Sequence, residues 1–162
     1  MKSLKFLPYI FMSAAILTSC GGNTVTGEVN DPFFILEKNC GCSSTNSQQK
    51  RKDLYEKFYQ NKFVTVNGVV QSIEDELLTL DCDFNHFTDT RITFESSDDL
   101  YELKVGSMVR VKFALRERDD YTDCDFIGDL GKIVSTNQEE ILGLVGKERT
   151  QQEMYESNEL SK

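Results

Sequence analysis

Apolar and polar residues alternate with a period of two in several parts of the chain, the pattern of strands that are buried on one face. Residues 108–116 show this alternation most clearly. Residues 63–73 are rich in β-branched side chains, and Gly68 shifts the alternation so that Val69 and Ile73 continue it, as a β-bulge does. The predicted strands are 63–73, 78–84, 91–95, 108–116 and 124–134.

Helical spacing occurs on both sides of these strands. Leu54 and Phe58 are four residues apart and predict a short helix over residues 50–60. Thr136 and Glu139 have the spacing of a capping box, which predicts the start of a second helix after the last strand.

The remaining segments carry weaker patterns. Residues 32–60 are expected to form an irregular segment followed by the short helix, and residues 96–105 could hold one helical turn. Gly146 is expected to end the second helix. Residues 147–162 have no apolar period and are expected to form a polar tail, frayed or weakly helical.

These elements predict a mainly β protein. Five strands with a bulged first strand, a helical insert before the fourth strand and a flanking helix fit a small Greek-key barrel of the OB type. The barrel with its C-terminal helix would occupy residues 61–146. Closure of the barrel would leave no exposed sheet edge.

The N-terminus has the features of an export signal. Two lysines precede the apolar run 6–17, which is shorter than the roughly 20 residues that a membrane-spanning helix needs. The sequence Leu17-Thr18-Ser19-Cys20 resembles the lipobox of bacterial lipoproteins. This resemblance implies that residues 1–19 are removed and that Cys20 is acylated, which attaches the protein to a membrane.

Removal of the export signal would change the charge and the N-terminus of the mature chain. Residues 20–31 are expected to form a lipid-anchored, flexible tether. Loss of residues 1–19 removes two lysines and shifts the formal charge from −9 to −11. The predicted location is the bacterial cell envelope, where the membrane-anchored lipoprotein would face the periplasm or the cell surface.

Composition and charge narrow the classes of function. The 162 residues are 39% hydrophobic and 28% charged, which fits one modest globular domain rather than a disordered chain or a multi-span membrane protein. An acidic chain is poorly suited to bind phosphate backbones, and the positions expected to face outward on the second and third strands lack stacking aromatics. No nucleic-acid partner is therefore predicted. These outward positions are Thr79, Asp81, Asp83, Arg91, Thr93 and Glu95.

Two stretches resemble a family of bacterial proteins. They are residues 62–70 (Lys-Phe-Val-Thr-Val-Asn-Gly-Val-Val) and residues 103–112 (Leu-Lys-Val-Gly-Ser-Met-Val-Arg-Val-Lys), followed by a late strand with Asp-Cys before Ile-Val. They look like envelope lipoproteins with a tRNA-anticodon-binding-like OB-fold domain, over about residues 50–135. The resemblance implies an OB barrel exposed in the envelope, with no implied tRNA binding.

Four further cysteines lie in the exported part, where disulfides are common. Cys82 and Cys124 occur in the same local string, Asp-Cys-Asp-Phe, which favours a bond between them. Cys40 and Cys42 would then pair across one glycine, or alternatively each would reach Cys82 or Cys124. Structural bonds are favoured over redox catalysis because no βαβ pattern accompanies the cysteines.

Four aspartates flank two of these cysteines and are the sharpest lead to a ligand. If Asp81, Asp83, Asp123 and Asp125 met at one end of the barrel, their oxygens would attract calcium, although the pattern is not an EF-hand loop. The alternative is that they keep a sheet edge soluble. Zinc bound by two cysteines and His86 is disfavoured because the thiols would be oxidised first.

No catalytic constellation is evident. His86 is the only histidine, no serine or cysteine stands in a nucleophile motif, and no phosphate-cradling glycine loop occurs. The predicted function is thus a lipid-anchored envelope binding or interaction module without catalysis, and a calcium- or small-ligand-dependent module is the alternative. Candidate residues for an envelope protein or glycan partner are Phe84, His86, Phe87 and Tyr121. The alternative is that the three aromatic residues cap the core and that His86 is an exposed loop residue.

Overall fold

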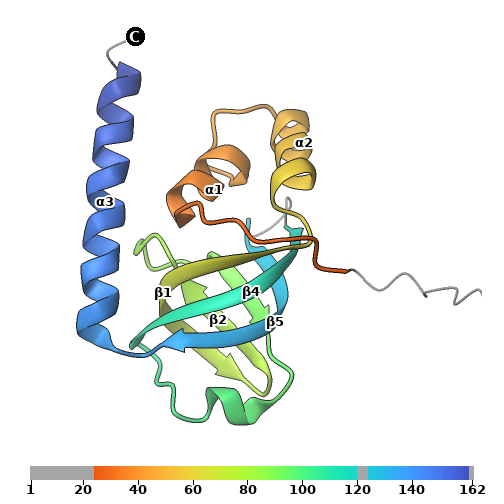
Figure 1. The fold of residues 1–162 in the computed structure, drawn as a ribbon, viewed down its shortest axis with the longest axis vertical. Coiled ribbons are helices and arrows are strands. Elements are labelled where there is room, and N and C mark those ends of the chain that lie inside the picture. The colour runs from red at the N-terminus through yellow and green to blue at the C-terminus, as the bar shows by residue number, and fades with distance from the viewer. Residues whose placement is uncertain (1–23, 120–123, 161–162) are drawn as a thin grey trace, which may run out of the picture.

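The computed structural model describes residues 24–119 and 124–160 (Figure 1). The predicted leader, Cys20, Tyr121 and Asp123 lie outside these residues. The elements are α1 (Phe33–Cys40), α2 (Gln48–Phe58), β1 (Lys62–Glu74), β2 (Leu77–Asp81), β3 (Thr90–Thr93), the 3₁₀ helix η1 (Ser97–Leu100), β4 (Met108–Arg118), β5 (Phe126–Ser135) and α3 (Gln138–Leu160).

The five strands form a closed barrel in the order β1-β2-β3-β5-β4. All pairs are antiparallel except β3 and β5, which run parallel. This confirms the predicted OB-type Greek-key barrel with short flanking helices. The core inside the barrel consists of side chains with no exposed surface: Leu78, Leu80, Ile92, Val109, Val111, Phe113, Leu115 and Phe126.

The bulge in β1 lies later than predicted. Val66 and Val70 keep one phase, and the register against β2 shifts only between Val70 and Ser72. Gly68 is needed for another reason, since a Cβ there would lie 2.9 Å from the Asp81 carbonyl oxygen of β2. Close approach of two backbones, rather than a bulge, explains this glycine.

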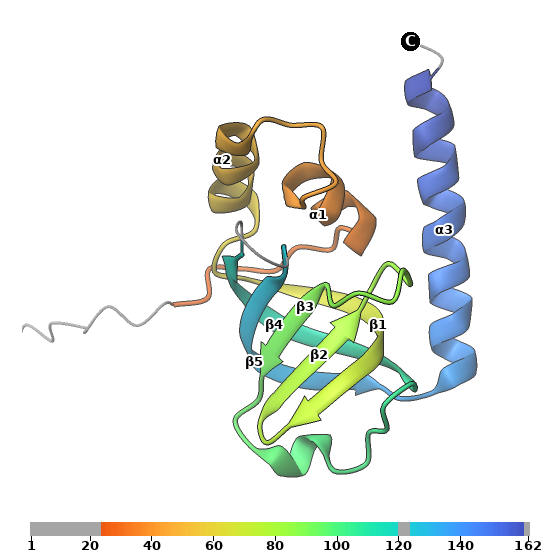
Figure 2. The same cartoon turned by 180° about the vertical axis from the view of Figure 1, so that it is seen from behind.

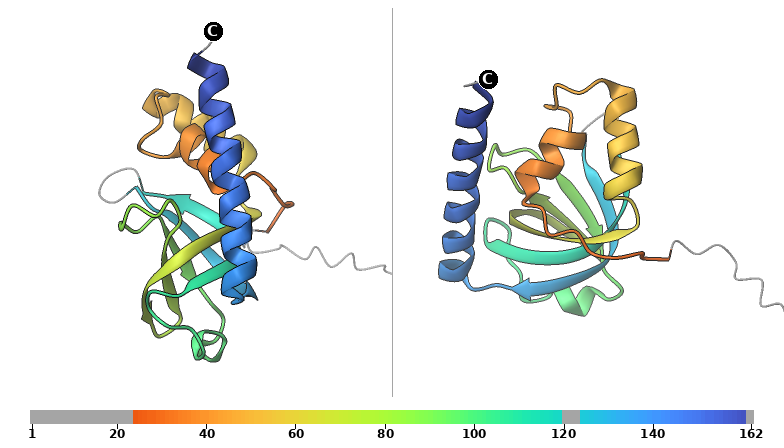
Figure 3. Two further views of the ribbon diagram at one scale, coloured as in Figure 1. Left: turned by 90° about the vertical axis from the view of Figure 1, so that its left-hand side faces the viewer. Right: turned by 45° about the horizontal axis from the view of Figure 1, so that its top comes forward.

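The segment before the barrel is more ordered than predicted. Phe33, Leu36 and Cys40 are buried on one face of α1, a helix where an irregular segment was expected. The Phe33 ring packs edge-on against Phe126 of β5, with 5.9 Å between centroids. Figure 3 shows α1 and α2 standing over one end of the barrel.

The chain joins the barrel earlier than the predicted tether allows. The amide of Thr26 donates to the Asn61 carbonyl at 2.8 Å, and the amide of Val29 donates to the Phe63 carbonyl at 2.8 Å. Glu28 also forms an ion pair with Lys112 of β4 at 2.5 Å. Residues 26–29 of the predicted tether therefore lie against β1 and β4 in the structure.

Helix α3 differs from its prediction at both ends. The cap is Asn137, whose Oδ1 accepts from the amides of Glu139 (3.1 Å) and Glu140 (3.2 Å), rather than Thr136. The helix also continues through Gly146 to Leu160, so the expected polar tail is part of it. Among the described helices, none is long and apolar enough to cross a membrane.

Candidate functional sites at one end of the barrel

A cleft of about 380 Å³ lies between α1, α3 and the β2–β3 loop (residues 82–89). Figure 2 shows α3 running along the side of the barrel and on past α1, with this loop pointing toward the helix. Four aromatic residues from three elements line the cleft: Phe33, Phe34, Phe84 and Tyr155. We call it the α1–α3 cleft.

Aromatic contacts connect the walls of the α1–α3 cleft. Tyr155 of α3 packs against Phe34 at 6.4 Å between ring centroids, and the Lys38 ammonium lies 4.1 Å from the Tyr155 ring. On the other side, the Arg149 guanidinium lies 5.1 Å from the Phe84 ring. Such contacts stabilise the position of α3 modestly.

Acidic side chains outnumber basic ones around the α1–α3 cleft. Lys38 and Arg149 are the cations of its lining. The acidic members are Glu37, Asp83, Glu148 and Glu156. Burial raises the pKa of Glu148, while Arg110 and the hydrogen bond from Asn67 act in the opposite direction.

The β2–β3 loop brings three carboxylates together beside this cleft. Oxygens of Asp81, Asp83 and Asp89 all lie within 4.8 Å of one another. Asp81 Oδ1 accepts from the amide of Phe84 at 2.5 Å, and its Oδ2 accepts from the amide of His86 at 2.9 Å. Asp89 closes the loop because its Oδ2 accepts from the amide of Cys82 at 2.5 Å. We call these three residues the aspartate cluster.

Burial and neighbouring charges disfavour ionisation of two members of the aspartate cluster, Asp83 and Asp89. Burial raises the pKa of Asp89 to about 7, and the charges of Asp83 and Asp81 act in the same direction, while its backbone hydrogen bonds oppose the rise. Burial also raises the pKa of Asp83. A bound cation would stabilise the ionised carboxylates.

The predicted set of aspartates is wrong in part. Asp81 is buried, 2% exposed, rather than facing outward, and it does meet Asp83. Asp125 is buried elsewhere and pairs with Arg91 at 2.5 Å. Asp89 takes part instead, and the sequence carried a signal for it: oxygen-bearing side chains at positions 81, 83, 85 and 89 have the spacing of the first, third, fifth and ninth residues of a calcium loop.

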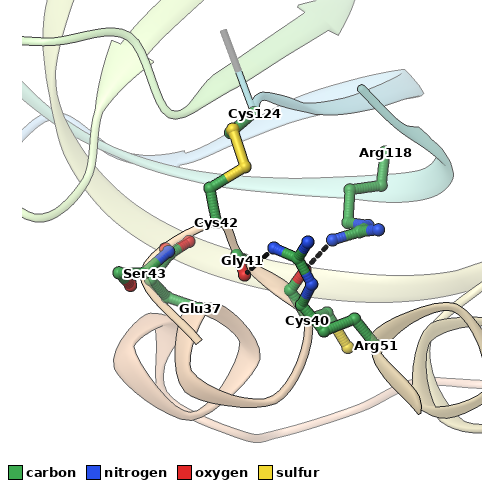
Figure 4. Close-up of a disulfide and its surroundings, with 8 residues drawn as sticks. All are labelled: Glu37, Cys40, Gly41, Cys42, Ser43, Arg51, Arg118 and Cys124. Carbon is green, nitrogen blue, oxygen red and sulfur yellow. Dashed lines mark hydrogen bonds between the residues drawn. A yellow bond between two sulfur atoms is a disulfide. The ribbon is translucent and has the colours of Figure 1, made fainter. Parts of the chain in front are cut away.

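The disulfide joins Cys42 to Cys124, with 5.7 Å between their Cα atoms (Figure 4). The favoured Cys82–Cys124 bond is therefore wrong. The alternative, in which Cys40 and Cys42 each reach Cys82 or Cys124, is right for Cys42 but not for Cys40, because Cys40 and Cys82 are free and buried. The Cys82 thiol instead lies 3.8 Å from the Thr90 hydroxyl between neighbouring strands. The repeated string misled because Cys124 lies beside Cys42 in the turn after α1, while the Cys82 thiol lies against Thr90.

Two arginines hold the turn that carries the disulfide. Arg51 Nη1 donates to the Gly41 carbonyl at 3.0 Å, and Arg118 Nη1 donates to the Cys40 carbonyl (Figure 4). These carbonyls lie at the C-terminus of α1, where cations are favourable. Burial raises the pKa of the Cys40 thiol to about 12, so that thiol is a poor nucleophile.

The predicted partner surface is split by the structure. Phe84, with φ of 67°, lines the α1–α3 cleft. His86 and Phe87 point into solvent, and Phe87 is 73% exposed. The sequence reasoning did not single out Phe34 and Tyr155, whose packing depends on how α3 lies against α1.

Comparisons with known proteins add little beyond this geometry. No protein-family model and no curated protein match the chain. Among solved structures, it is similar to a "putative nucleic acid-binding lipoprotein" from Klebsiella pneumoniae. The two chains are 17% identical with a TM-score of 0.47, and the match covers 67% of this chain and 92% of that one. The fold assignment rests on the strand pairing itself.

Proposed function

We propose that this protein is a lipid-anchored binding module of the bacterial envelope, and that its α1–α3 cleft takes a basic, amphipathic segment of an envelope protein. The observation that carries the proposal is the cleft itself, because aromatic walls and an acidic surplus occur in one concave site. No catalysis is proposed. The anchor is supported by the lipobox-like sequence that ends at Cys20.

The chemistry of the cleft selects the class of partner. Apolar side chains of the partner would pack on Phe34 and Tyr155, and its lysines or arginines would face the acidic residues of the rim. The overall charge of −9, or −11 without the leader, would attract a basic segment and speed its association. An acidic partner would be repelled.

Fluorescence anisotropy tests the cleft. The probe is a labelled amphipathic peptide of Leu and Lys, and the reference is its counterpart of Leu and Glu. Tyr155→Ala should weaken binding of the basic peptide at least about fivefold, the loss expected at an interface hot spot. Phe58→Ala is the matched control, because Phe58 is a similarly exposed aromatic, 44% against 41%, outside the cleft.

Two results of this experiment would contradict the proposed partner. One is equal binding of the basic and acidic peptides. The other is an unchanged affinity in Tyr155→Ala. A labelled single-stranded oligonucleotide belongs in the same series, since tight binding of it would overturn our expectation that nucleic acid is not a partner.

The anchor is tested separately. Cys20→Ala should abolish incorporation of labelled palmitate and release the protein from the membrane fraction. Cys42→Ala is the control, because it removes a disulfide cysteine and leaves the lipobox-like sequence intact. Unchanged membrane fractionation of Cys20→Ala would reject lipid anchoring.

Calcium binding at the aspartate cluster is the second candidate function. The favouring observation is that carboxylate oxygens of three residues lie within 4.8 Å, close enough to share one ion. Titration calorimetry should show calcium binding to the wild type and its loss in Asp83→Asn. Asp75→Asn in the exposed β1–β2 turn is the control, and absence of heat in the wild type would end this candidate.

A further inference from the structure

A second cleft, of about 570 Å³, lies between α2 and the end of β4. It shares no residue with the α1–α3 cleft. Its lining includes Gln48, Lys52, Tyr55, Gln60, Glu117 and Arg118. We call it the α2–β4 cleft.

A buried hydrogen-bond donor of this cleft has no partner among the described residues. Tyr55 is only 5% exposed, and its hydroxyl has no hydrogen-bond partner among the described residues. Nε of Arg51, one helical turn before Tyr55 on α2, also has no partner among these residues, but Arg51 does not line the cleft. Buried donors without partners are rare in folded proteins and are costly, so a ligand that accepts hydrogen bonds would stabilise them.

Arg118 of the cleft lining is buried and lies near a second arginine, Arg51. Arg118 is 9% exposed, and its guanidinium and that of Arg51 bond adjacent carbonyls at the end of α1 (Figure 4). Burial and the charge of Arg51 lower the pKa of Arg118, although Glu37, Cys40 and Tyr55 act in the opposite direction. An anion would relieve the repulsion between the two arginines.

We propose that the α2–β4 cleft binds a single phosphate group, held by Arg118 and the Tyr55 hydroxyl with Lys52 at the rim. A phosphate oxyanion accepts several hydrogen bonds in a small volume and suits guanidinium donors. Glu56 and Glu117 also line the cleft, and Oε1 of Glu56 lies 3.8 Å from Nζ of Lys52. These carboxylates would repel an extended polyanion, so one phosphate group fits better than a nucleic-acid backbone. The inference is independent of the partner proposed for the α1–α3 cleft.

Tyr55 of α2 and Tyr59 at the end of the same helix allow the proposal to be tested with a matched control. The full chain, purified in detergent, is titrated with inorganic phosphate by calorimetry and by thermal melting. Tyr55→Phe keeps the ring and removes a hydroxyl that bonds no residue of the described ranges 24–119 and 124–160. It should melt at or above the wild-type temperature without phosphate, yet bind phosphate at least about fivefold more weakly.

Tyr59→Phe is the matched control. Its hydroxyl donates to Asp31 at 2.9 Å and accepts from Asn39 at 3.1 Å, so the variant should melt lower but keep wild-type phosphate affinity. Opposite effects of the two variants on stability and affinity are not expected from a general loss of packing.

The proposal is overturned if millimolar phosphate neither releases heat nor raises the melting temperature of the wild type. It is also overturned if Tyr55→Phe binds phosphate as the wild type does. Glycerol 3-phosphate distinguishes the sources of the group. Tighter binding than inorganic phosphate assigns the site to a phosphate ester such as a lipid headgroup, and weaker binding assigns it to free phosphate.

Discussion

Single carboxylates shape the β2–β3 loop. Phe84 and His86 adopt φ of 67° and 75°, a left-handed conformation that is unfavourable for residues with a Cβ. The buried carboxylate of Asp81 compensates by accepting both of their amides. As a result, the Phe84 ring lines the α1–α3 cleft, and one aspartate controls both the loop and an aromatic wall.

The first prediction concerns Asp89 and pH. Because the folded state raises the pKa of Asp89 from 3.8 to about 7, its contribution to stability is complete below about pH 4 and is lost as the pH rises through 7. In buffer with a chelator, the free energy of unfolding of the wild type should fall over this range relative to Asp89→Asn. Each unit of pKa difference corresponds to about 1.4 kcal/mol.

Denaturant unfolding at several pH values measures this difference. Asp75→Asn is the control for a general effect of removing one negative charge, because Asp75 is exposed in the β1–β2 turn. Parallel pH profiles of the wild type and Asp89→Asn would show that Asp89 does not titrate in this range.

At the scale of elements, the Cys42–Cys124 bond ties the α1–α2 connection to the start of β5. The two residues are 82 positions apart, so the bond closes a long loop in the unfolded chain. Of the helical layer over the barrel end, α2 lies within this loop, whereas α1 and the turn held by Arg51 and Arg118 lie just before it.

The second prediction follows from this loop. Cys42→Ser should lower the free energy of unfolding by about 4 to 5 kcal/mol in the chain-entropy model. A reductant should lower the melting temperature of the wild type and of Cys82→Ala, since Cys82 is not in the bond. Cys42→Ser should not respond. A reductant response that disappears in Cys82→Ala would restore the pairing expected from the sequence.

The third prediction concerns the glycines of α3. Gly146 lies inside the helix, and a Cβ added there would meet nothing within 4 Å. Gly146→Ala should therefore raise stability by about 0.5 to 1 kcal/mol. Gly106, with φ of 84°, is the matched contrast, because alanine there should destabilise. A lower melting temperature for Gly146→Ala would indicate that the helix ends near residue 146.

At the scale of the whole molecule, the candidate sites gather where α1 and α2 cover the barrel (Figure 1). Acidic residues outnumber basic ones in the α1–α3 cleft, whereas the α2–β4 cleft contains the buried Arg118. The net charge of −9 would speed the association of a basic partner and slow that of an anionic one.

The fourth prediction concerns the effect of ionic strength on the attraction of a basic peptide by the net charge. Raising the ionic strength from about 0.01 M to about 0.15 M shortens the Debye length from about 30 Å to about 8 Å. Association of the basic peptide with the α1–α3 cleft should slow markedly over this range, as stopped-flow fluorescence would measure. A rate independent of salt would show that the overall charge has no part in recognition.

The strands were predictable from the sequence because a strand that is buried on one face has apolar residues at every second position. This alternation can be seen in neighbouring residues. Residues 108–116 lie within β4, and the predicted barrel is the one observed. The helix α1 was not predicted, since its apolar run is short and its period becomes evident only when Phe33, Leu36 and Cys40 are seen buried together.

The sequence alone therefore determined the periodic elements, the barrel type, the acidic charge and the lipobox-like motif, all of which depend on neighbouring residues or on composition. Only the tertiary structure decided that Cys42 pairs with Cys124, that Asp89 joins Asp81 and Asp83, and that Tyr155 faces Phe34. These partners are distant along the chain or meet through a loop. The Cys42–Cys124 and Tyr155–Phe34 contacts depend on how α1 and α3 pack on the closed barrel, which no local pattern encodes, whereas the aspartates meet through the path of the β2–β3 loop.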